Sequence, residues 1–262
     1  MKLTIRLLLI AFLVGCTKVP ITGRRQLNML PESQLMSMSL TEYQSFLKEN
    51  KTINGSNDAK LVKSVGGKIS AAVETYLKKH QQGNRIKDFK WEFNLVDDQT
   101  VNAWCMPGGK VVFYTGILPI TQDEKGMAVV MGHEIAHAIA RHGNERMSQG
   151  LIVQGGGIAL SVALSEKPEL AQGLFLQSYG IGSQLGMLKF SRMHESEADK
   201  MGLIFMAMAG YDPREAVKFW ERMAAQGGSK PPQFLSTHPS DATRIADLKE
   251  FMPEALKYYK GA

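Results

Sequence analysis

The chain has 262 residues, of which 44% are hydrophobic and 21% are charged, and both fractions are close to those of an ordinary globular domain. This length supports one substantial core and leaves little room for two large domains. The formal net charge is +6, but no cluster of Lys and Arg is interleaved with aromatic residues. The charge therefore does not indicate a nucleic-acid-binding protein.

The first residues have the pattern of a signal peptide. Lys2 and Arg6 give a positive start, residues 7–13 form an apolar run, and Leu13-Val14-Gly15-Cys16 ends the run with small residues before a cysteine. The apolar run is too short to span a bilayer, which takes about 20 apolar residues. Its ending resembles the lipobox of bacterial lipoproteins, which predicts cleavage of residues 1–15 and a lipid on Cys16. A plain secretory signal with an incidental cysteine is the alternative.

Removal of the signal peptide lowers the formal charge to +4, because Lys2 and Arg6 are lost, and leaves Cys105 as the unmodified cysteine. An intramolecular disulfide is then excluded. Cys105 lies in an apolar strand pattern, so we expect it to be buried rather than paired with another molecule. Residues 16–31 are polar and rich in turn formers, which favours a lipidated tether before a folded domain at 32–262.

Hydrophobic periodicity divides that domain into helices and a small sheet. Helical patterns run from about residue 31 to 48 and from 58 to 80. The period then changes to that of strands, and the pattern is helical again from about residue 121 onward. An α+β fold follows, mostly helical with a small antiparallel sheet. The expected strands are 91–95, 101–106 and 111–114, and the expected helix breaks are Gly155-Gly156-Gly157, Gly210 and Gly227-Gly228.

The run from Leu151 to Leu164 is apolar enough to raise the question of a membrane span. It contains Gln154 and three glycines, and it stops at Ser165-Glu166-Lys167. A spanning helix needs a longer apolar stretch. We therefore expect a buried or lid-like helical segment.

One motif points directly to a chemistry. His133-Glu134-Ile135-Ala136-His137 is an H-E-x-x-H motif inside an uncharged helical pattern. Because a helix has about 3.6 residues per turn, His133 and His137 share one face and can bind one metal ion, with Glu134 beside it. A catalytic zinc keeps one position for a water molecule, whose pKa it lowers to about 7. Glu134 is then the candidate general base, and a third protein ligand should lie downstream.

A carboxylate for that third position occurs in the stretch from Ser191 to Asp199. Glu195 and Asp199 are one helical turn apart on the same face. Glu197 is an alternative third ligand, but Glu195 is preferred because of its i, i+4 relation to Asp199.

Two other histidines near these motifs are expected to have structural roles. On a continuous helix, His142 is rotated away from the zinc face because it lies five positions after His137. His194 adjoins Glu195 but does not share its direction.

Taken together, the two motifs resemble those of the gluzincin metallopeptidases that include the CAAX prenyl proteases, the HtpX-like proteases, Oma and BepA. The resemblance implies a zincin-like domain with one zinc ion per chain. The Glu of the second motif is the third zinc ligand in that family, which corresponds to Glu195 here. Asp199 resembles the carboxylate that orients a zinc-bound histidine.

Further segments resemble the lipoprotein or periplasmic branch of that family. Residues 102–110 resemble the edge-strand hairpin beside the active site, so Asn102, Trp104 and Cys105 are expected along the substrate strand. An exposed edge strand binds a peptide through main-chain hydrogen bonds, which favours broad specificity for unfolded protein. Residues 19–27 resemble the segment that follows the lipid anchor.

His238 lies in Thr237-His238-Pro239, which resembles a C-terminal H-P motif of the family. Near the metal it can act catalytically by donating to the oxyanion, or it can occupy the open zinc position and hold the enzyme latent. A loop residue before a proline is the third interpretation. Arg244 is expected to pair with a carboxylate of the site or to lie on a solvated face.

The sequence therefore predicts a zinc endopeptidase anchored by Cys16 to a bacterial envelope, in which Glu134 activates water. The expected location is the outer membrane, facing the periplasm, because Thr17-Lys18 lacks the Asp of inner-membrane sorting. The expected partners are the membrane, misfolded or unassembled envelope proteins and the outer-membrane assembly machinery, and nucleic acid is not expected.

The alternative is a non-catalytic, chaperone-like zinc lipoprotein that binds unfolded chains. Glu134 favours the enzyme, because a structural zinc site has no need of a carboxylate between its histidines.

Overall fold

The computed structural model describes residues 16–154, 156, 159–180, 191–226, 232–238 and 242–261. The predicted signal peptide and the predicted break at Gly227-Gly228 lie outside the described residues, as does most of the break at residues 155–157. The strands are β1 Cys16–Lys18, β2 Arg25–Leu27, β3 Thr52–Ile53, β4 Glu92–Val96, β5 Ala103–Met106 and β6 Lys110–Tyr114. The helices are α2 Glu32–Glu49, α3 Asn57–Lys79, α4 Leu118–Thr121, α5 Glu124–Ala140, α6 His142–Val153, α7 Leu160–Glu166, α8 Pro168–Ser178, α9 Arg192–Met208, α10 Glu215–Ala225, α11 Gln233–Thr237 and α12 Ala242–Leu256.

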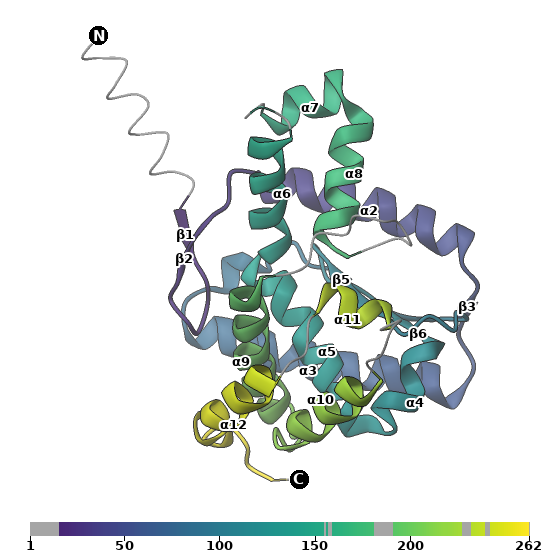
Figure 1. The fold of residues 1–262 in the computed structure, drawn as a ribbon, viewed down its shortest axis with the longest axis vertical. Helices are drawn as coiled ribbons and strands as arrows, with labels where there is room; N and C mark the ends of the chain where they lie inside the picture. The colour runs from purple at the N-terminus through teal and green to yellow at the C-terminus, as the bar shows by residue number, and fades with distance from the viewer. Residues whose placement is uncertain are drawn as a thin grey trace.

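The predicted α+β fold class is confirmed, because helices make up most of the described chain and surround a small sheet (Figure 1). The two helical patterns before the sheet correspond to α2 and α3, and the three predicted strands correspond to β4, β5 and β6. From Leu118 onward the described elements are all helices. The two-residue strand β3 is too short to give a periodic signal.

The main sheet has the strand order β3-β4-β6-β5 and is mixed. The β5–β6 pair is antiparallel, as expected, and so is the pair that the unpredicted strand β3 forms with β4. Strands β4 and β6 are instead parallel, with Leu95 opposite Phe113. A wholly antiparallel sheet was expected because each strand was assumed to pair with the next strand in sequence. Instead the chain crosses from β4 to the sheet edge, forms β5 there, and turns back through Gly108 and Gly109 into β6. Both glycines have positive φ, of 82° and 79°, which glycine adopts without strain.

Helix α5 carries the H-E-x-x-H motif through the middle of the core. The carboxylate of Asp123 caps its first turn by accepting hydrogen bonds from the backbone N–H groups of Lys125 and Gly126. Every residue from Gly126 to Ala140 is buried, and the helix packs against α3, α9, α10 and β5. Burial on all sides explains why this stretch carries so few charged residues.

Helices α5 and α9 cross at two glycines. A Cβ atom on Gly132 would lie 3.0 Å from the carbonyl oxygen of Gly202, and a Cβ atom on Gly202 would lie 3.0 Å from the backbone nitrogen of His133. The absence of both side chains lets the two backbones approach closely. This crossing brings the acidic residues at the start of α9 beside the histidines of α5.

Residues 16–31, which the sequence indicates as a polar tether, contain a hairpin that packs on the domain. Strands β1 and β2 are antiparallel, with Cys16 opposite Leu27. Gln26 is buried, and its Nε2 donates to the carbonyl of Ala140, 2.7 Å away at the end of α5. Val19 is 1% exposed and belongs to the main core. The described part of this segment is thus held against the C-terminal end of α5.

The apolar run from Leu151 to Leu164 is split between the end of α6 and the start of α7, which joins α6 to α8 at one end of the molecule (Figure 1). Leu151 and Leu160 are buried, whereas Val153 is 81% exposed. Where it is described, the segment that was expected to be buried or lid-like is therefore only partly buried. Among the described helices, none combines the length and the apolar character that a membrane crossing requires.

Candidate metal centre

The imidazoles of His133 and His137 point to one place between α5 and α9. Their Nε2 atoms lie 3.0 Å apart, and both residues are buried. The i, i+4 spacing on one helix produces this geometry. Two imidazole nitrogens directed at one buried point are the beginning of a metal site.

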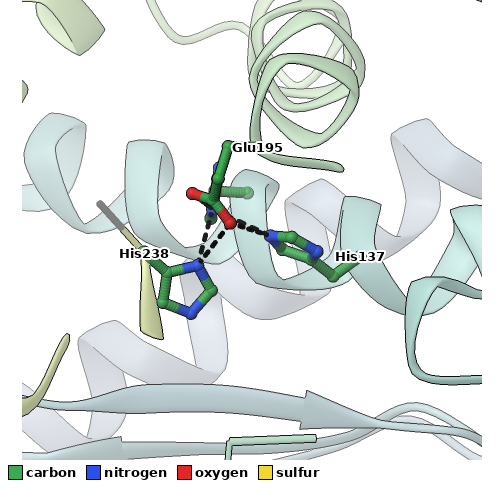
Figure 2. Close-up of side chains that lie close together, drawn as sticks. His137, Glu195 and His238 are labelled. Carbon is green, nitrogen blue, oxygen red and sulfur yellow. Dashed lines mark hydrogen bonds and ion pairs between the residues drawn. The ribbon is translucent and has the colours of Figure 1, made fainter. Parts of the chain in front are cut away.

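Glu195 of α9 and His238, directly after α11, complete the cluster (Figure 2). Oε1 of Glu195 lies 3.3 Å from His137 Nε2 and 3.1 Å from His238 Nδ1, and Oε2 lies 3.4 Å from His133 Nε2. One ligand atom from each of the four residues lies within 4.8 Å of all the others. Three imidazole nitrogens and one carboxylate oxygen are donors that zinc accepts, so these residues fit a zinc ion.

Asp199 lies behind His133 on the side away from the cluster. Its Oδ1 is 2.9 Å from His133 Nδ1, which leaves Nε2 of that ring directed at the other ligand atoms. Arg244 of α12 binds both carboxylates, donating from Nη2 to Asp199 Oδ1 at 2.6 Å and from Nη1 to Glu195 Oε2 at 2.8 Å. Of the two sequence-based alternatives for Arg244, the structure places it in the site, where it is 6% exposed.

These charges alter the acidities of the cluster. Burial opposes a charge on His133, but the carboxylates of Glu195 and Asp199 outweigh it and raise the pKa of the imidazole to about 9. Burial alone would also raise the pKa of Glu195, yet electrostatic interactions with His238 and Arg244 hold it well below its usual range. The carboxylate ligand is therefore ionised at neutral pH, as metal binding requires.

Glu134 lies next to the cluster, and one of its oxygens accepts no hydrogen bond from the described residues. It is 3% exposed, and among the described residues its Oε1 has no hydrogen-bond partner. The same Oε1 lies 3.6 Å from His238 Nε2, an ion-pair contact that is longer than a hydrogen bond. Burial raises the pKa of this carboxyl group. A buried acceptor without a hydrogen bond lowers the stability of the folded protein, and such groups are typical of functional sites.

His137 is supported from behind by a residue that sequence reasoning set aside. Nδ1 of His142 lies 2.9 Å from His137 Nδ1, and Nε2 of His142 lies 3.1 Å from Glu197 Oε2. The expectation that His142 points away from the site assumed a continuous helix. Instead α5 ends at Ala140, Arg141 takes a left-handed conformation with φ of 62°, and α6 starts at His142. The turn at Arg141 brings His142 back toward the site.

Glu197, the alternative third ligand, lies outside the group of four ligand atoms and instead binds His142. His194, which was expected to be structural, is also buried, with Nε2 2.9 Å from Glu145 Oε2. The rings of His142 and His194 stack with their centroids 4.4 Å apart. The spacing of His142 with Glu145 and of His194 with Glu197 on their helices was a local signal for this cluster. The contacts between the two segments join residues 49 and 55 positions apart, which sequence spacing does not reveal.

The predicted substrate strand is β5, which forms the edge of the sheet. The expectation of an exposed strand is wrong, because all four residues of β5 are buried. Trp104 packs edge-on against Phe46 of α2, with ring centroids 5.1 Å apart. Cys105 is buried, as predicted, and its burial together with the charge of Glu134 raises the pKa of the thiol well above its usual range. Asn102 is buried just before the strand, and within the described part of the chain its Nδ2 has no hydrogen-bond partner.

His238 is held in the site by aromatic residues. Its ring stacks on Phe234 of α11 with centroids 4.6 Å apart, and Phe234 in turn stacks on Trp220 of α10. The backbone nitrogen of Phe234 donates to the carbonyl of Val101, just before β5. The segment 232–238 therefore connects the edge of the sheet with the cluster.

Comparison with known proteins adds relatives of similar sequence. The mitochondrial metalloendopeptidase OMA1 of Saccharomyces cerevisiae is 36% identical over 72% of this chain and 55% of its own length. The human metalloendopeptidase OMA1, mitochondrial, is 32% identical over 91% of this chain and 46% of its own length. The β-barrel assembly-enhancing protease of Escherichia coli K12 is 30% identical over 61% of this chain and 34% of its own length. The chain thus spans roughly a third to a half of the length of these relatives.

These relatives correct the expected location. A bacterial outer-membrane lipoprotein facing the periplasm was predicted, but the relatives that match nine-tenths of the chain, from cattle and human, are named as mitochondrial proteins. The location was inferred from Thr17-Lys18 after Cys16, by analogy with the sorting of bacterial lipoproteins. Two residues carry too little information to decide a compartment. The assignment to a bacterial lipoprotein branch is likewise not supported.

The model of peptidase family M48 matches residues 67–252. This range contains α5 with both histidines, Glu195 and Asp199 on α9, and His238. The resemblance to metallopeptidases of the Oma and BepA type is thereby confirmed at the level of the family. The chain belongs to peptidase family M48.

Proposed function

We propose that the protein is a zinc-dependent endopeptidase that cleaves unfolded or misfolded proteins. The observation that carries this proposal is Glu134, a buried carboxylate in contact with His238 of the four-residue cluster, whose Oε1 accepts no hydrogen bond from the described residues. A site that served only to hold the fold together would gain nothing from this orphaned acceptor. A general base for water has this position and this raised pKa.

The residues of the site divide the chemistry among them. His133, His137 and Glu195 would hold a zinc ion, which would supply a Lewis acid for the peptide carbonyl and lower the pKa of water. Glu134 is placed to act as the general base for water and as the general acid for the leaving amine. Asp199 keeps the proton on Nδ1 of His133, and Arg244 keeps Glu195 ionised and oriented.

His238 gives the site a closed form. Its Nδ1 belongs to the group of ligand atoms, 3.2 Å from His133 Nε2, so it can occupy the fourth position of the metal. Four protein ligands are typical of closed zinc sites, whereas catalytic sites keep one position open. We infer that the enzyme is latent in this conformation, and that the segment 232–238 moves away before a substrate binds.

The proposed substrates follow from the edge of the sheet. Strand β5 has no strand on its outer side among the described residues, so its backbone groups there can pair with an extended peptide once the covering residues move. Main-chain pairing does not depend on the side chains of the substrate. Unfolded or misfolded chains, which expose backbone, are the class that this recognition selects.

Attachment to a membrane through a lipid on Cys16 stays a proposal. It is supported by the lipobox-like ending of the leader, Leu13-Val14-Gly15-Cys16. Replacement with Cys16→Ser is expected to release the protein into the soluble fraction. Retention of this variant on membranes would instead indicate that the exposed apolar residues of α6 and α7 hold the protein there.

A second candidate function is a non-catalytic, chaperone-like zinc protein. The complete set of four ligand atoms favours it, because structural zinc sites have four protein ligands. In that case Glu134 has no chemical task, and its replacement leaves the function unchanged.

The Glu134→Gln variant distinguishes the two functions. If the protein is an endopeptidase, this variant should retain zinc, measured by elemental analysis, and should no longer cleave casein. Glu124→Gln is the matched control, since Glu124 is on the same helix but at its half-exposed N-terminal end. Equal cleavage by the wild type and by Glu134→Gln would refute the assigned mechanism.

A further inference from the structure

The two histidines of the H-E-x-x-H motif are supported in different ways. His133 Nδ1 contacts the carboxylate of Asp199 directly, at 2.9 Å. His137 Nδ1 contacts another imidazole, that of His142, at the same distance. The carboxylate of Glu197 contacts His142 and not His137 itself. Neither His142 nor Glu197 is used by the proposed mechanism.

The contacts behind His137 admit one consistent direction of hydrogen bonding. His137 directs Nε2 at the other ligand atoms, and a metal-binding nitrogen carries no proton, so its proton is on Nδ1. This N–H then donates to Nδ1 of His142, which must be unprotonated. The proton of a neutral His142 is therefore on Nε2, where the carboxylate of Glu197 accepts it 3.1 Å away.

Glu197 is held in turn by the N-terminal hairpin. Its Oε1 accepts from the hydroxyl of Thr22 at 2.7 Å, and its Oε2 accepts from Nε of Arg24 at 2.9 Å. Both donors belong to the turn between β1 and β2, which is more than 170 residues away in sequence. The orientation of Glu197 thus depends on where this turn lies.

Arg24 is fixed by a second carboxylate. Its Nη1 and Nη2 donate to the two oxygens of Glu145 at 2.9 and 2.7 Å, a paired geometry that guanidinium forms and ammonium does not. The side chain of Arg24 is 19% exposed, and those of Glu145 and Glu197 are each 6% exposed. A fork that joins two nearly buried carboxylates is rigid, because loss of either contact leaves a buried charge unpaired.

We propose that Arg24, Glu197 and His142 form a relay that positions the zinc ligand His137, so that the N-terminal hairpin is part of the metal centre. The proposal rests on the proposed function only in that the four-residue cluster binds zinc. Arg24 and Glu197 are positioning residues, since they act on the metal through His142 and His137. The segment that the sequence indicates as a tether thereby contributes to metal affinity.

The test measures metal binding by the full chain rather than proteolysis. Zinc affinity is measured by competition with a chromogenic chelator, and the ligand geometry is read from the visible absorption of the cobalt-substituted protein. The variants are Arg24→Ala and Glu197→Gln, with Arg25→Ala as the matched control because Arg25 is the exposed neighbour in the same hairpin. Removal of such outer supports typically weakens metal binding by about 10- to 100-fold.

We expect both relay variants to lose affinity within that range and to shift the cobalt spectrum, and Arg25→Ala to match the wild type. His142→Gln, whose amide can both accept and donate, should retain more affinity than His142→Leu. The thermal midpoint of the metal-free protein is recorded for each variant to detect a purely structural effect. A lower midpoint combined with unchanged zinc affinity and an unchanged cobalt spectrum would overturn the relay.

This readout is separate from that of the proposed function. A wild type that binds zinc but leaves casein intact would contradict the endopeptidase, and the comparison of zinc affinities would still decide the relay.

Discussion

Arg244 lies over the indole of Trp220, with its guanidinium carbon 3.2 Å from the ring centroid. The stacked guanidinium reaches two carboxylates at once, one that binds the metal and one that orients His133. A planar cation on an aromatic face is held in one orientation, which a flexible ammonium would not be. Trp220 therefore helps to place Glu195 although it contacts no ligand oxygen itself.

This stacking leads to a prediction for Arg244→Lys. The variant keeps the charge but loses the fork and the flat contact with Trp220, so we expect zinc affinity to fall by about 10- to 100-fold. Chelator competition measures this change. Arg214→Lys is the control, because Arg214 makes a similar forked pair with Asp212 on the surface. Equal effects of the two substitutions would contradict the role of Arg244.

The close crossing of α5 and α9 predicts the effect of Gly202→Ala. The new methyl group would meet the backbone of His133 at 3.0 Å, so the helices must separate by a few tenths of an ångström. We expect the free energy of unfolding to fall by about 1 to 3 kcal/mol, as for other overpacked cores. Zinc affinity should fall too, because Glu195 moves with α9.

Gly173→Ala on α8 is the control for that substitution, since a Cβ atom there meets nothing within 4 Å. It should be neutral or slightly stabilising in urea denaturation. If Gly202→Ala behaved in the same way, the crossing would not limit the position of Glu195.

His238→Ala tests whether His238 closes the metal site. Removal of the imidazole opens the fourth position, so we expect the initial rate of casein cleavage to rise several-fold while zinc binds less tightly. A lower rate with unchanged zinc affinity would assign His238 to the oxyanion instead. An unchanged rate would leave it as a loop residue.

The acid stability of the protein should depend on Glu145. Although burial opposes it, hydrogen bonds from His194 and Arg24 lower the pKa of this carboxyl group to about 2, against 4.5 for a free side chain. The unfolded chain therefore takes up this proton at a higher pH than the folded one. The stabilisation is present above pH 4.5 and is lost as the pH falls from there toward 2.

Integrated over that range, Glu145 contributes up to about 3 kcal/mol to the free energy of unfolding. Urea denaturation at a series of pH values should give a shallower acid decline for Glu145→Gln than for the wild type. Parallel declines of the two proteins would show that other carboxylates cause the acid loss.

The residues nearest to the metal could be predicted from the sequence because their spacing follows from helix geometry. His133 and His137 are one turn apart, and so are Glu195 and Asp199, so each pair is oriented by local structure alone. The helices α2 and α3 were predictable for the same reason, through their apolar periodicity. That the two pairs meet came from the family resemblance and not from spacing.

What the sequence could not provide depends on contacts between distant segments. The parallel pairing of β4 with β6 is set by where β5 is inserted, which leaves no local signature. The contact of Arg24 with Glu197 joins residues 173 positions apart. The position of His142 depends on the left-handed conformation of Arg141. Arginine rarely adopts this conformation, so the residue type gave no indication of it.

The burial of β5 also bears on the behaviour of the protein in concentrated solution. An uncovered edge strand pairs readily with the sheet of another molecule, and proteins avoid this by hiding such edges. The burial of β5 therefore also disfavours pairing of the protein with copies of itself. Any change that holds the site open should make the protein more active and, at the same time, more prone to aggregate.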